Sequence, residues 1–271
     1  QELAAARLPL LERREREVRV VRGHAVRRRE AGAIPAPGAD RVPLDIGGLN
    51  VTWLHHRAET RLKAALGLPP TPPVIGSFNQ QAVIVDENIL KHFDADFRVI
   101  YARDGNNWAP GPDGFVRDEY GISYKLSPDG LYYDFAKHPL AEADLAAIER
   151  HRFSEPRSEH RIAGLAERIQ HYGKEYALVL EWSRDSVFGA SSWLRGLEQF
   201  FMDLADDSPL ADALMDKVTE HQIEVFDFIL GRFGKHIDAV RIGDDLGSQG
   251  GLLISPDTYR RKVKPRHAQL V

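Results

Sequence analysis

The chain has 271 residues, of which 43% are hydrophobic and 28% are charged, a composition typical of a globular domain with a substantial core. The net charge of -4 gives no electrostatic reason to expect nucleic acid or an anionic membrane as a partner, and the absence of cysteine excludes disulfides and thiolate metal ligands within these residues. No apolar run approaches the roughly 20 residues that span a bilayer, and no signal-peptide pattern is present. We therefore expect a soluble, cytoplasmic protein that acts on a small molecule.

The first segment, residues 1–38, differs in composition from the rest. It contains a run of arginines interspersed with glutamates and ends in the breaker-rich linker 31–38. A nucleic-acid arm and a solvated helix or loose leader both fit this pattern, and the glutamates favour the leader. We expect the folded domain to occupy residues 39–271. Because the chain begins with Gln1 and stops inside a predicted helix, we also expect it to be an incomplete piece of that domain.

From residue 41 onward, short apolar strands alternate with amphipathic helices. Strands are predicted at 42–46, 97–101, 176–181 and 237–242. Helices are predicted at 60–66, 87–93, 161–172, 193–204, 208–234 and from 255 onward, the last with a kink at Pro265. Strands this apolar, joined through helices, favour a parallel sheet with both faces covered.

One stretch interrupts the alternation. Residues 121–125 and 131–135 flank the turn sequence Ser-Pro-Asp-Gly at 127–130, which predicts a β-hairpin inserted into the fold. A doubly wound sheet and a barrel both fit the remaining pattern. No Gly-x-Gly-x-x-Gly follows the first strand and no phosphate-binding Gly-Lys-Ser/Thr occurs, so nucleotide-binding interpretations lose support.

Charged residues follow the predicted strands, where the loops of an α/β barrel converge on its active site. The first strand delivers Asp45, the second Arg103 and Asp104, the third Glu181, and the fourth the adjacent pair Asp244 and Asp245. Two adjacent carboxylates either point to opposite sides or repel each other in one site, where one would have a raised pKa and could act as an acid or base. The alternative is that one caps a turn while the other faces solvent.

The other polar residues leave alternatives open. Glu181 could bind a substrate hydroxyl or a cation, or pair with Arg184. His55 and His56 could supply a metal ligand or a proton carrier, or could form a capping pair. Arg98 and Arg103 could hold an anionic substrate, although Arg98 inside a strand is equally well explained by a buried ion pair.

Several segments together resemble the uroporphyrinogen decarboxylase superfamily, which contains true decarboxylases and a large branch of corrinoid-dependent methyltransferases. The resemblance covers residue 39 onward and rests on the segments 40–48 (DRVPLDIGG), 96–98 (DFR), 243–249 (GDDLGSQ), 254–259 (ISPDTY) and the pair Lys264-Pro265. It implies a (β/α)8 barrel, of which this chain would supply about half the strands, with the hairpin as an insertion.

The details of the resemblance favour the methyltransferase branch. The arginine-rich motif of true decarboxylases is replaced here by residues 49–56 (LNVTWLHH). The resemblance implies that the protein moves a methyl group between a small methylated substrate and a corrinoid carried by a partner protein. That branch holds zinc through a His-x-Cys pair and a later Cys, ligands that would lie beyond Val271, so no metal ligand is assigned in this chain.

The resemblance and the strand ends together give the candidate site. Catalytic roles are expected for Asp244, Asp245 and Glu181. Substrate contacts are expected from His55, Arg103, Trp193 and Gln249. Two alternatives remain: decarboxylation of uroporphyrinogen or a smaller acid, which relies on charge placement around a carbanion, and a non-catalytic or incomplete barrel module whose exposed strand edges another chain would cover.

Overall fold

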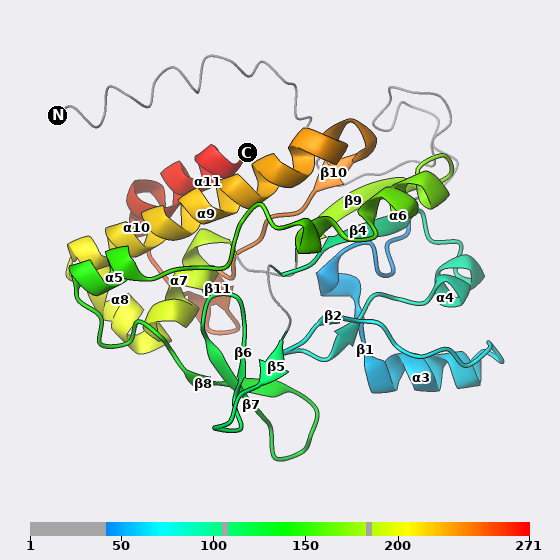
Figure 1. Cartoon of the computed structure of the whole chain (residues 1–271), viewed down its shortest axis with the longest axis horizontal. Coiled ribbons are helices and arrows are strands. Elements are labelled where there is room, and N and C mark those ends of the chain that lie inside the picture. The colour runs from blue at the N-terminus through cyan, green and yellow to red at the C-terminus, as the bar shows by residue number, and fades with distance from the viewer. Residues whose placement is uncertain (1–41, 105–107, 183–185) are drawn as a thin grey trace.

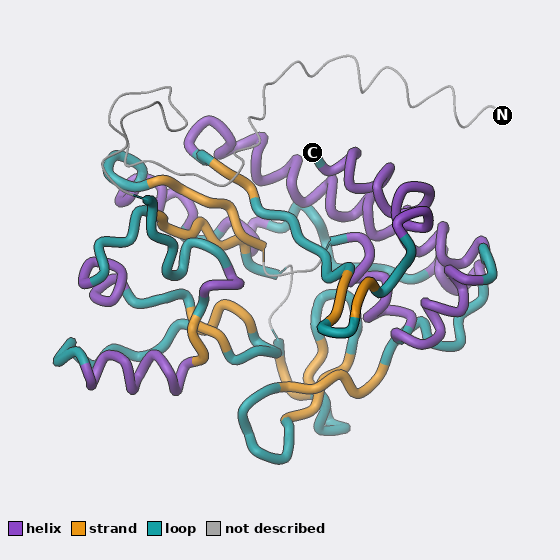
Figure 2. Tube along the Cα trace, turned by 180° about the vertical axis from the view of Figure 1, so that it is seen from behind, coloured by secondary structure: helices purple, strands orange, loops and turns teal. Residues whose placement is uncertain are grey.

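The computed structural model of the protein describes residues 42–104, 108–182 and 186–271 (Figure 1). These residues form a mixed α/β fold in which helices lie along a three-stranded parallel sheet, and two of the three antiparallel sheets lie on the opposite side of the molecule (Figures 1 and 2). The leader predicted for residues 1–38 lies outside the described residues. So does Arg184, the predicted partner of Glu181.

The helices and strands are short apart from one long helix. The α-helices are α3 (His56–Ala65), α4 (Glu87–His92), α5 (Leu145–Arg150), α6 (Leu165–Tyr172), α7 (Val187–Arg195), α8 (Leu197–Ala205), α9 (Pro209–Phe233), α10 (Pro256–Thr258) and α11 (Lys264–Leu270). The strands are β1 (Leu54–His55), β2 (Ile75–Ser77), β3 (Ala82–Val83), β4 (Phe97–Ala102), β5 (Ala109–Pro110), β6 (Val116–Arg117), β7 (Ser123–Leu126), β8 (Tyr133–Lys137), β9 (Ala177–Trp182), β10 (Ala239–Val240), β11 (Gly247–Ser248) and β12 (Gly251–Leu252). The 3-10 turns are η1 (Asn50–Thr52), η2 (Glu159–Ile162) and η3 (Gly234–His236), and η4 (Tyr259–Val263) is a π-helical turn.

The parallel sheet has the order β10-β9-β4, so its strands lie side by side in the order in which they occur in the chain, with β5 to β8 inserted between β4 and β9. Strands β4 and β9 pair over six residues, from Phe97 with Ala177 to Ala102 with Trp182. Every residue of β9 is buried, as expected for a parallel strand covered on both faces. The predicted strands at 97–101 and 176–181 are confirmed, whereas the strand predicted at 237–242 is reduced to Ala239–Val240.

The strand predicted at 42–46 is wrong. This segment consists of bends and loop, although Leu44 is fastened to β4 by two hydrogen bonds with Asp96: its N–H donates to the side chain and its carbonyl accepts from the Asp96 N–H. Pro43 has no N–H to donate to a ladder, and Gly47 has a φ of +91°. The described residues form an open three-stranded parallel sheet and no closed barrel.

A small antiparallel sheet of order β1-β3-β2 lies below the parallel sheet in Figure 1, next to α3. Its strands contain two or three residues each, too few for an alternating pattern to be recognised in the sequence. Trp53 packs edge-on against Tyr101 of β4, with ring centroids 5.4 Å apart, and so joins this sheet to the parallel one.

The predicted hairpin is confirmed as β7 and β8, which pair antiparallel. It is part of a larger four-stranded sheet of order β5-β6-β7-β8 that projects from the molecule at the bottom of Figure 1. The turn between the strands is closed by Asp129, whose carboxylate accepts hydrogen bonds from Ser127 Oγ and the Leu131 N–H. The insertion therefore has a sheet of its own.

The helices follow their sequence signals closely. Ser208 caps α9, with Pro209 in the first helical position, as predicted. The helix predicted at 193–204 is divided at Gly196, which has a φ of +86° and separates α7 from α8.

The end of the described chain lies alongside α9. Figures 1 and 2 both show α11 running next to this helix, and Arg266 Nε contacts Asp216 Oδ1 at 2.8 Å. The interruption predicted at Pro265 occurs just before it, in the π-helical turn η4, so that proline stands in the first turn of α11, where its missing N–H is tolerated. Among the described residues, no helix has both the length and the apolar character needed to cross a membrane.

Candidate active site at the ends of the parallel strands

Glu181 lies near the carboxyl end of β9 and has no exposed surface. Its carboxylate accepts a hydrogen bond from the Asn50 N–H, with Oε2 at 3.1 Å, and forms an ion pair with Arg241, whose Nη1 is 3.3 Å from Oε1. Arg241 directly follows β10, so the two charges come from neighbouring parallel strands. Gly243 leaves room for this arginine, because a Cβ at that position would lie 2.7 Å from its Nη2.

A second carboxylate, Asp45, lies close enough to Glu181 to influence its ionisation. Asp45 accepts hydrogen bonds from the Gly48 N–H at 2.7 Å and from Thr52 Oγ1 at 3.1 Å. Gly48 permits this close turn, because a Cβ there would lie 2.5 Å from the Cβ of Phe97 and 2.6 Å from the Asp45 carboxylate. The residues that follow the segment 42–46 thus form a tight loop whose N–H and hydroxyl groups bind the Asp45 carboxylate.

Both acids are shifted toward the protonated form. The pKa of Glu181 is raised from 4.5 to about 7, chiefly by burial and to a lesser extent by Asp45, against the lowering effects of Arg241 and the Asn50 N–H. Burial also raises the pKa of Asp45, against the lowering effect of its bonds with Gly48 and Thr52. Near neutral pH the Glu181 site therefore contains a carboxyl group that can either give or take a proton.

Asp244 has a different environment. Its side chain is 1% exposed and accepts hydrogen bonds from the N–H groups of Phe188 and Gly189 at the start of α7, at 2.9 and 2.7 Å. The same carboxylate contacts His267 Nε2 of α11 at 2.7 Å. The other nitrogen of that imidazole, Nδ1, faces the hydroxyl of Tyr259 at 3.5 Å. Asp244 thus joins the loop after β10 to the N-terminus of one helix and to the side chain of another.

The two adjacent aspartates point to different environments, as the turn-capping alternative anticipated. Asp245 is exposed next to the buried Asp244. Gln249 is exposed as well, in the turn between β11 and β12, where Ser248 Oγ accepts a hydrogen bond from the Gly250 N–H. Among the described residues, no contact attaches the side chain of Asp245 or Gln249 to the candidate site.

His55 and Trp193 lie in structural positions. His55 caps α3, since its Nδ1 accepts a hydrogen bond from the Arg57 N–H, and its Nε2 lies 3.0 Å from the Leu131 carbonyl in the hairpin loop. Trp193 lies in α7, is partly buried and packs against Phe135 with ring centroids 5.0 Å apart. These contacts attach the inserted sheet to the rest of the molecule.

Arg98, for which the sequence allowed either a substrate contact or a buried ion pair, forms the ion pair. It is buried and binds Glu87 through two hydrogen bonds of 2.9 Å while its guanidinium stacks 3.6 Å above the ring of Tyr176. This arrangement fastens α4 to the parallel sheet and leaves no contact for a substrate.

Arg103, by contrast, is exposed and lines a cavity of about 470 Å³ beyond the end of β4. Tyr101, Asp104 and Trp108 line the same cavity, together with residues of β2 and the loop after it. Asp104 is buried, and its two carboxylate oxygens accept hydrogen bonds from the indole N–H groups of Trp108 and Trp182.

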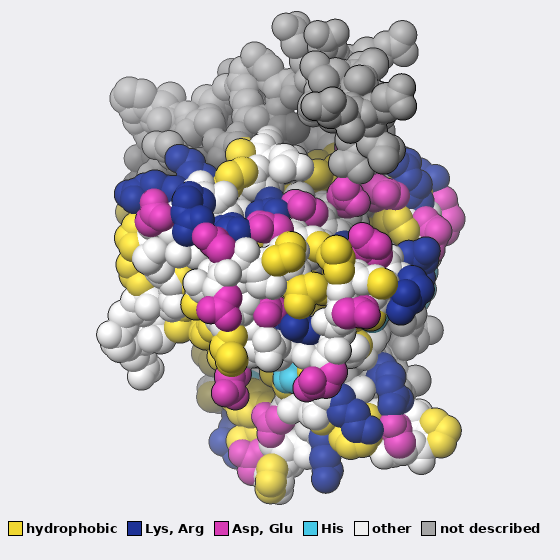
Figure 3. Space-filling model, turned by 90° about the vertical axis from the view of Figure 1, so that its left-hand side faces the viewer, with side chains coloured by type: hydrophobic (Ala, Val, Ile, Leu, Met, Phe, Trp, Pro, Cys, Tyr) yellow, Lys and Arg dark blue, Asp and Glu magenta, His cyan; other side chains and the backbone are white. Residues whose placement is uncertain are grey.

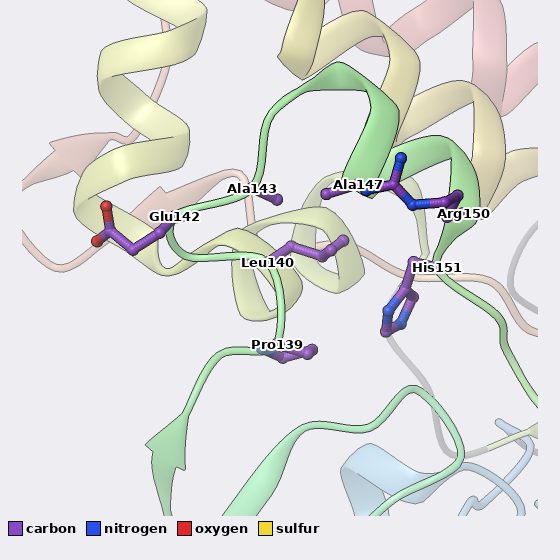
Figure 4. A pocket seen from close by; sticks show the side chains of 7 residues that line it. All are labelled: Pro139, Leu140, Glu142, Ala143, Ala147, Arg150 and His151. Atoms are coloured by element: carbon purple, nitrogen blue, oxygen red, sulfur yellow. The ribbon is translucent and has the colours of Figure 1, made fainter.

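A second cavity of about 480 Å³ lies against α5, far along the chain from the strand ends (Figure 4). It is lined by the loop before that helix and by His151, whose Nε2 lies 2.9 Å from the Tyr120 carbonyl. Burial lowers the pKa of this imidazole. None of the predicted site residues lines this cavity.

Asn50, Arg241 and His267 were missed by sequence reasoning although they contact the predicted acids. Asn50 is 131 residues from Glu181 in the chain and His267 is 23 residues from Asp244, so no local spacing marks either pair. Arg241 lay inside the strand predicted at 237–242, one residue before its end, and only the shorter observed strand β10 places it among the residues that follow a strand. In the described ranges, no group of three or more His, Asp or Glu side chains is placed to hold a metal ion.

The surface carries charges of both signs. On the face shown in Figure 3, lysine and arginine side chains alternate with aspartate and glutamate, and apolar side chains lie among them. That face presents no field of one sign to a nucleic acid or an anionic surface.

Comparison with known proteins gave one similar structure to report. No protein-family model and no curated protein matches the chain. A solved structure of a methyltransferase from Methanosarcina mazei is similar, with 18% sequence identity and a TM-score of 0.41 over 78% of this chain. The match spans 65% of the length of that structure.

Proposed function

We propose that this chain is part of a methyltransferase that moves a methyl group between a small methylated substrate and a corrinoid protein. The observation that carries the proposal is the state of Glu181, a fully buried carboxyl near the end of a central parallel strand with a pKa of about 7. Such a carboxyl is partly protonated at neutral pH and can hand its proton to a bound substrate.

The proton is needed because a methyl group leaves an ether oxygen slowly unless that oxygen is protonated. In the proposed step an electron pair of the acceptor on the partner protein would form a new bond to the methyl carbon while the bond between that carbon and the oxygen breaks. The electron pair of the broken bond stays on the oxygen, which takes the proton of Glu181. The demethylated product is an alcohol and Glu181 becomes a carboxylate. Arg241, 3.3 Å away, stabilises the negative charge that the step leaves on Glu181.

The order of the parallel strands supports the proposed barrel. Strands β4, β9 and β10 are neighbours in the sheet and follow one another in the chain apart from the inserted strands β5 to β8, which is compatible with the strand order of a (β/α)8 barrel. Asp244 would position the loop after β10 through its bonds to α7, and Asp245, exposed beside it, would be free to contact substrate. Catalytic roles for these two aspartates remain predictions.

The acceptor of the methyl group belongs to the partner. A reduced corrinoid on a carrier protein supplies the nucleophile. The described residues supply no metal site, so no step is assigned to a metal ion here. The part of this chain is to bind and orient the methyl donor and to supply the proton.

The test is a methyl-transfer assay with the full-length protein, a cob(I)alamin carrier and candidate methyl donors, followed through the corrinoid spectrum. We expect at least one donor to convert the spectrum and Glu181→Gln to slow the conversion. Glu175→Gln, an exposed glutamate just before the same strand, is the matched control and should leave the rate unchanged. If no donor changes the spectrum but uroporphyrinogen is consumed, the protein is a decarboxylase and the proposal is wrong.

A further inference from the structure

We propose that the cavity beyond the end of β4 is the donor pocket and that it selects a planar aromatic molecule carrying an anionic group. The inference rests on the proposed function for the methyl group, which makes the ligand a methoxylated aromatic acid. The aromatic ring and the negative charge of the ligand are inferred from the geometry of the cavity alone.

The cavity lies on the face of the sheet toward which Glu181 points. Tyr101 lines the cavity and is paired with Glu181 in the register of β4 and β9. Residues paired across neighbouring strands project to the same face of a sheet. Arg103, two residues after Tyr101, lines the cavity too. A ligand in this space therefore lies on the same face of the sheet as Glu181, which is buried and does not itself line the cavity.

Aromatic side chains form the walls. Phe78 and Trp108 line the cavity, and their ring centroids are 4.7 Å apart. Each ring is supported from behind, Phe78 by Tyr133 at 4.5 Å and Trp108 by Tyr124 at 5.0 Å. Tyr101 is held by a hydrogen bond from its hydroxyl to the Gly76 carbonyl. Rings fixed in this way favour a flat aromatic ligand over a flexible aliphatic one.

Arg103 brings a positive charge to the mouth of the cavity. Arg103 is exposed, and within the described parts of the chain no carboxylate forms an ion pair with its side chain, so its guanidinium can receive an anion. His160 lines the same space. The one carboxylate in the lining, Asp104, directs its oxygens at two indole N–H groups and so holds Trp108 in place.

The size of the cavity agrees with this ligand class. Its volume of about 470 Å³ falls within the range of pockets that enclose a small organic molecule. Val74 and Ile75, both exposed, form an apolar rim that the ring of a bound ligand would cover. Ring, charge and volume together describe a methoxybenzoate better than a methylated amine, whose positive charge would face Arg103.

The test measures binding by titration calorimetry with the full-length protein, independently of activity. Three probes separate the two features of the ligand: para-methoxybenzoate, the neutral para-methoxybenzyl alcohol and the non-aromatic methoxycyclohexane carboxylate. We expect the benzoate to bind at least about tenfold more tightly than either of the others, because each lacks one of the two contacts.

Two substitutions assign the contacts. Arg103→Gln should weaken binding of the benzoate about tenfold and leave binding of the alcohol unchanged. Phe78→Leu should weaken both aromatic probes about fivefold. Arg260→Gln, an exposed arginine of η4 outside the cavity, is the control and should change neither.

The outcomes separate the pocket from the reaction. Equal binding of the benzoate and the alcohol, or equal effects of the Arg103 and Arg260 substitutions, would overturn the proposed pocket. Tight binding of the benzoate without methyl transfer to any carrier would keep the pocket and reject the methyltransferase proposal. If both Arg103→Gln and Phe78→Leu leave the rate of methyl transfer unchanged, the methyltransferase proposal stands and the proposed pocket is rejected.

Discussion

Glu181 and Asp244 lie at corresponding ends of neighbouring parallel strands, and both are buried, yet their partners differ. Asp244 accepts hydrogen bonds from two helix N–H groups and contacts a histidine, so both of its carboxylate oxygens have polar partners. Glu181 has one N–H donor and one partly exposed arginine, and burial raises its pKa to about 7. Asp244 is therefore held by partners from two helices, whereas the Glu181 carboxyl has a pKa near neutral pH, the property on which the proposed function rests.

The largest effect should appear in the rate of methyl transfer after Glu181→Gln. Glutamine preserves the shape and the bond from Asn50 but cannot donate an acidic proton, so we expect a loss of at least about a hundredfold. The rate is measured in the corrinoid assay. A variant with the rate of the Glu175→Gln control would show that Glu181 is as structural as Asp244.

Asp244→Ala should produce the largest loss of stability. It leaves the N–H groups at the start of α7 and the imidazole of His267 without their acceptor, and breaking such a buried cluster costs roughly 3 to 5 kcal/mol. The free energy of unfolding in urea measures the loss. The neighbouring exposed residue provides the control: Asp245→Ala should change it by less than about 0.5 kcal/mol. Equal effects of the two substitutions on the free energy of unfolding would contradict a structural role for Asp244.

The ionisation of Glu181 should make stability fall as the pH rises. Because the pKa is higher in the folded protein than the ordinary value of 4.5, the folded state binds the proton more tightly and ionisation opposes folding. Relative to Glu181→Gln, the unmodified protein should lose about 2 to 3 kcal/mol between pH 5 and pH 8. Urea unfolding of both proteins at the two pH values gives this difference. A constant difference across this range would contradict the raised pKa.

The smallest effect is expected for His267→Ala. The substitution removes one partner of Asp244 but keeps the two N–H donors, so the loss should be about 1 to 2 kcal/mol, clearly below that of Asp244→Ala. Unfolding measurements of the single and double variants test this, since the two substitutions share a contact and should not add. Additive effects would show that the imidazole does not depend on Asp244.

The sequence by itself determined those elements whose signals are local. The apolar runs of β4 and β9, the Ser208-Pro209 start of α9 and the turn at 127–130 each act within a few residues, and the structure confirms all of them. Charged residues at strand ends were also recognisable, which is why Glu181 and Asp244 could be singled out.

The conformation and environment of those residues depend on the tertiary structure. The segment 42–46 has the composition of a strand but is held by Asp96 and ends in a tight loop, a result that no local pattern contains. The contrast between Asp244 and Asp245, and the raised pKa of Glu181, depend on burial and on partners tens of residues away in the chain. Propensity and periodicity act between neighbours in sequence, whereas desolvation and charge pairing act between neighbours in space.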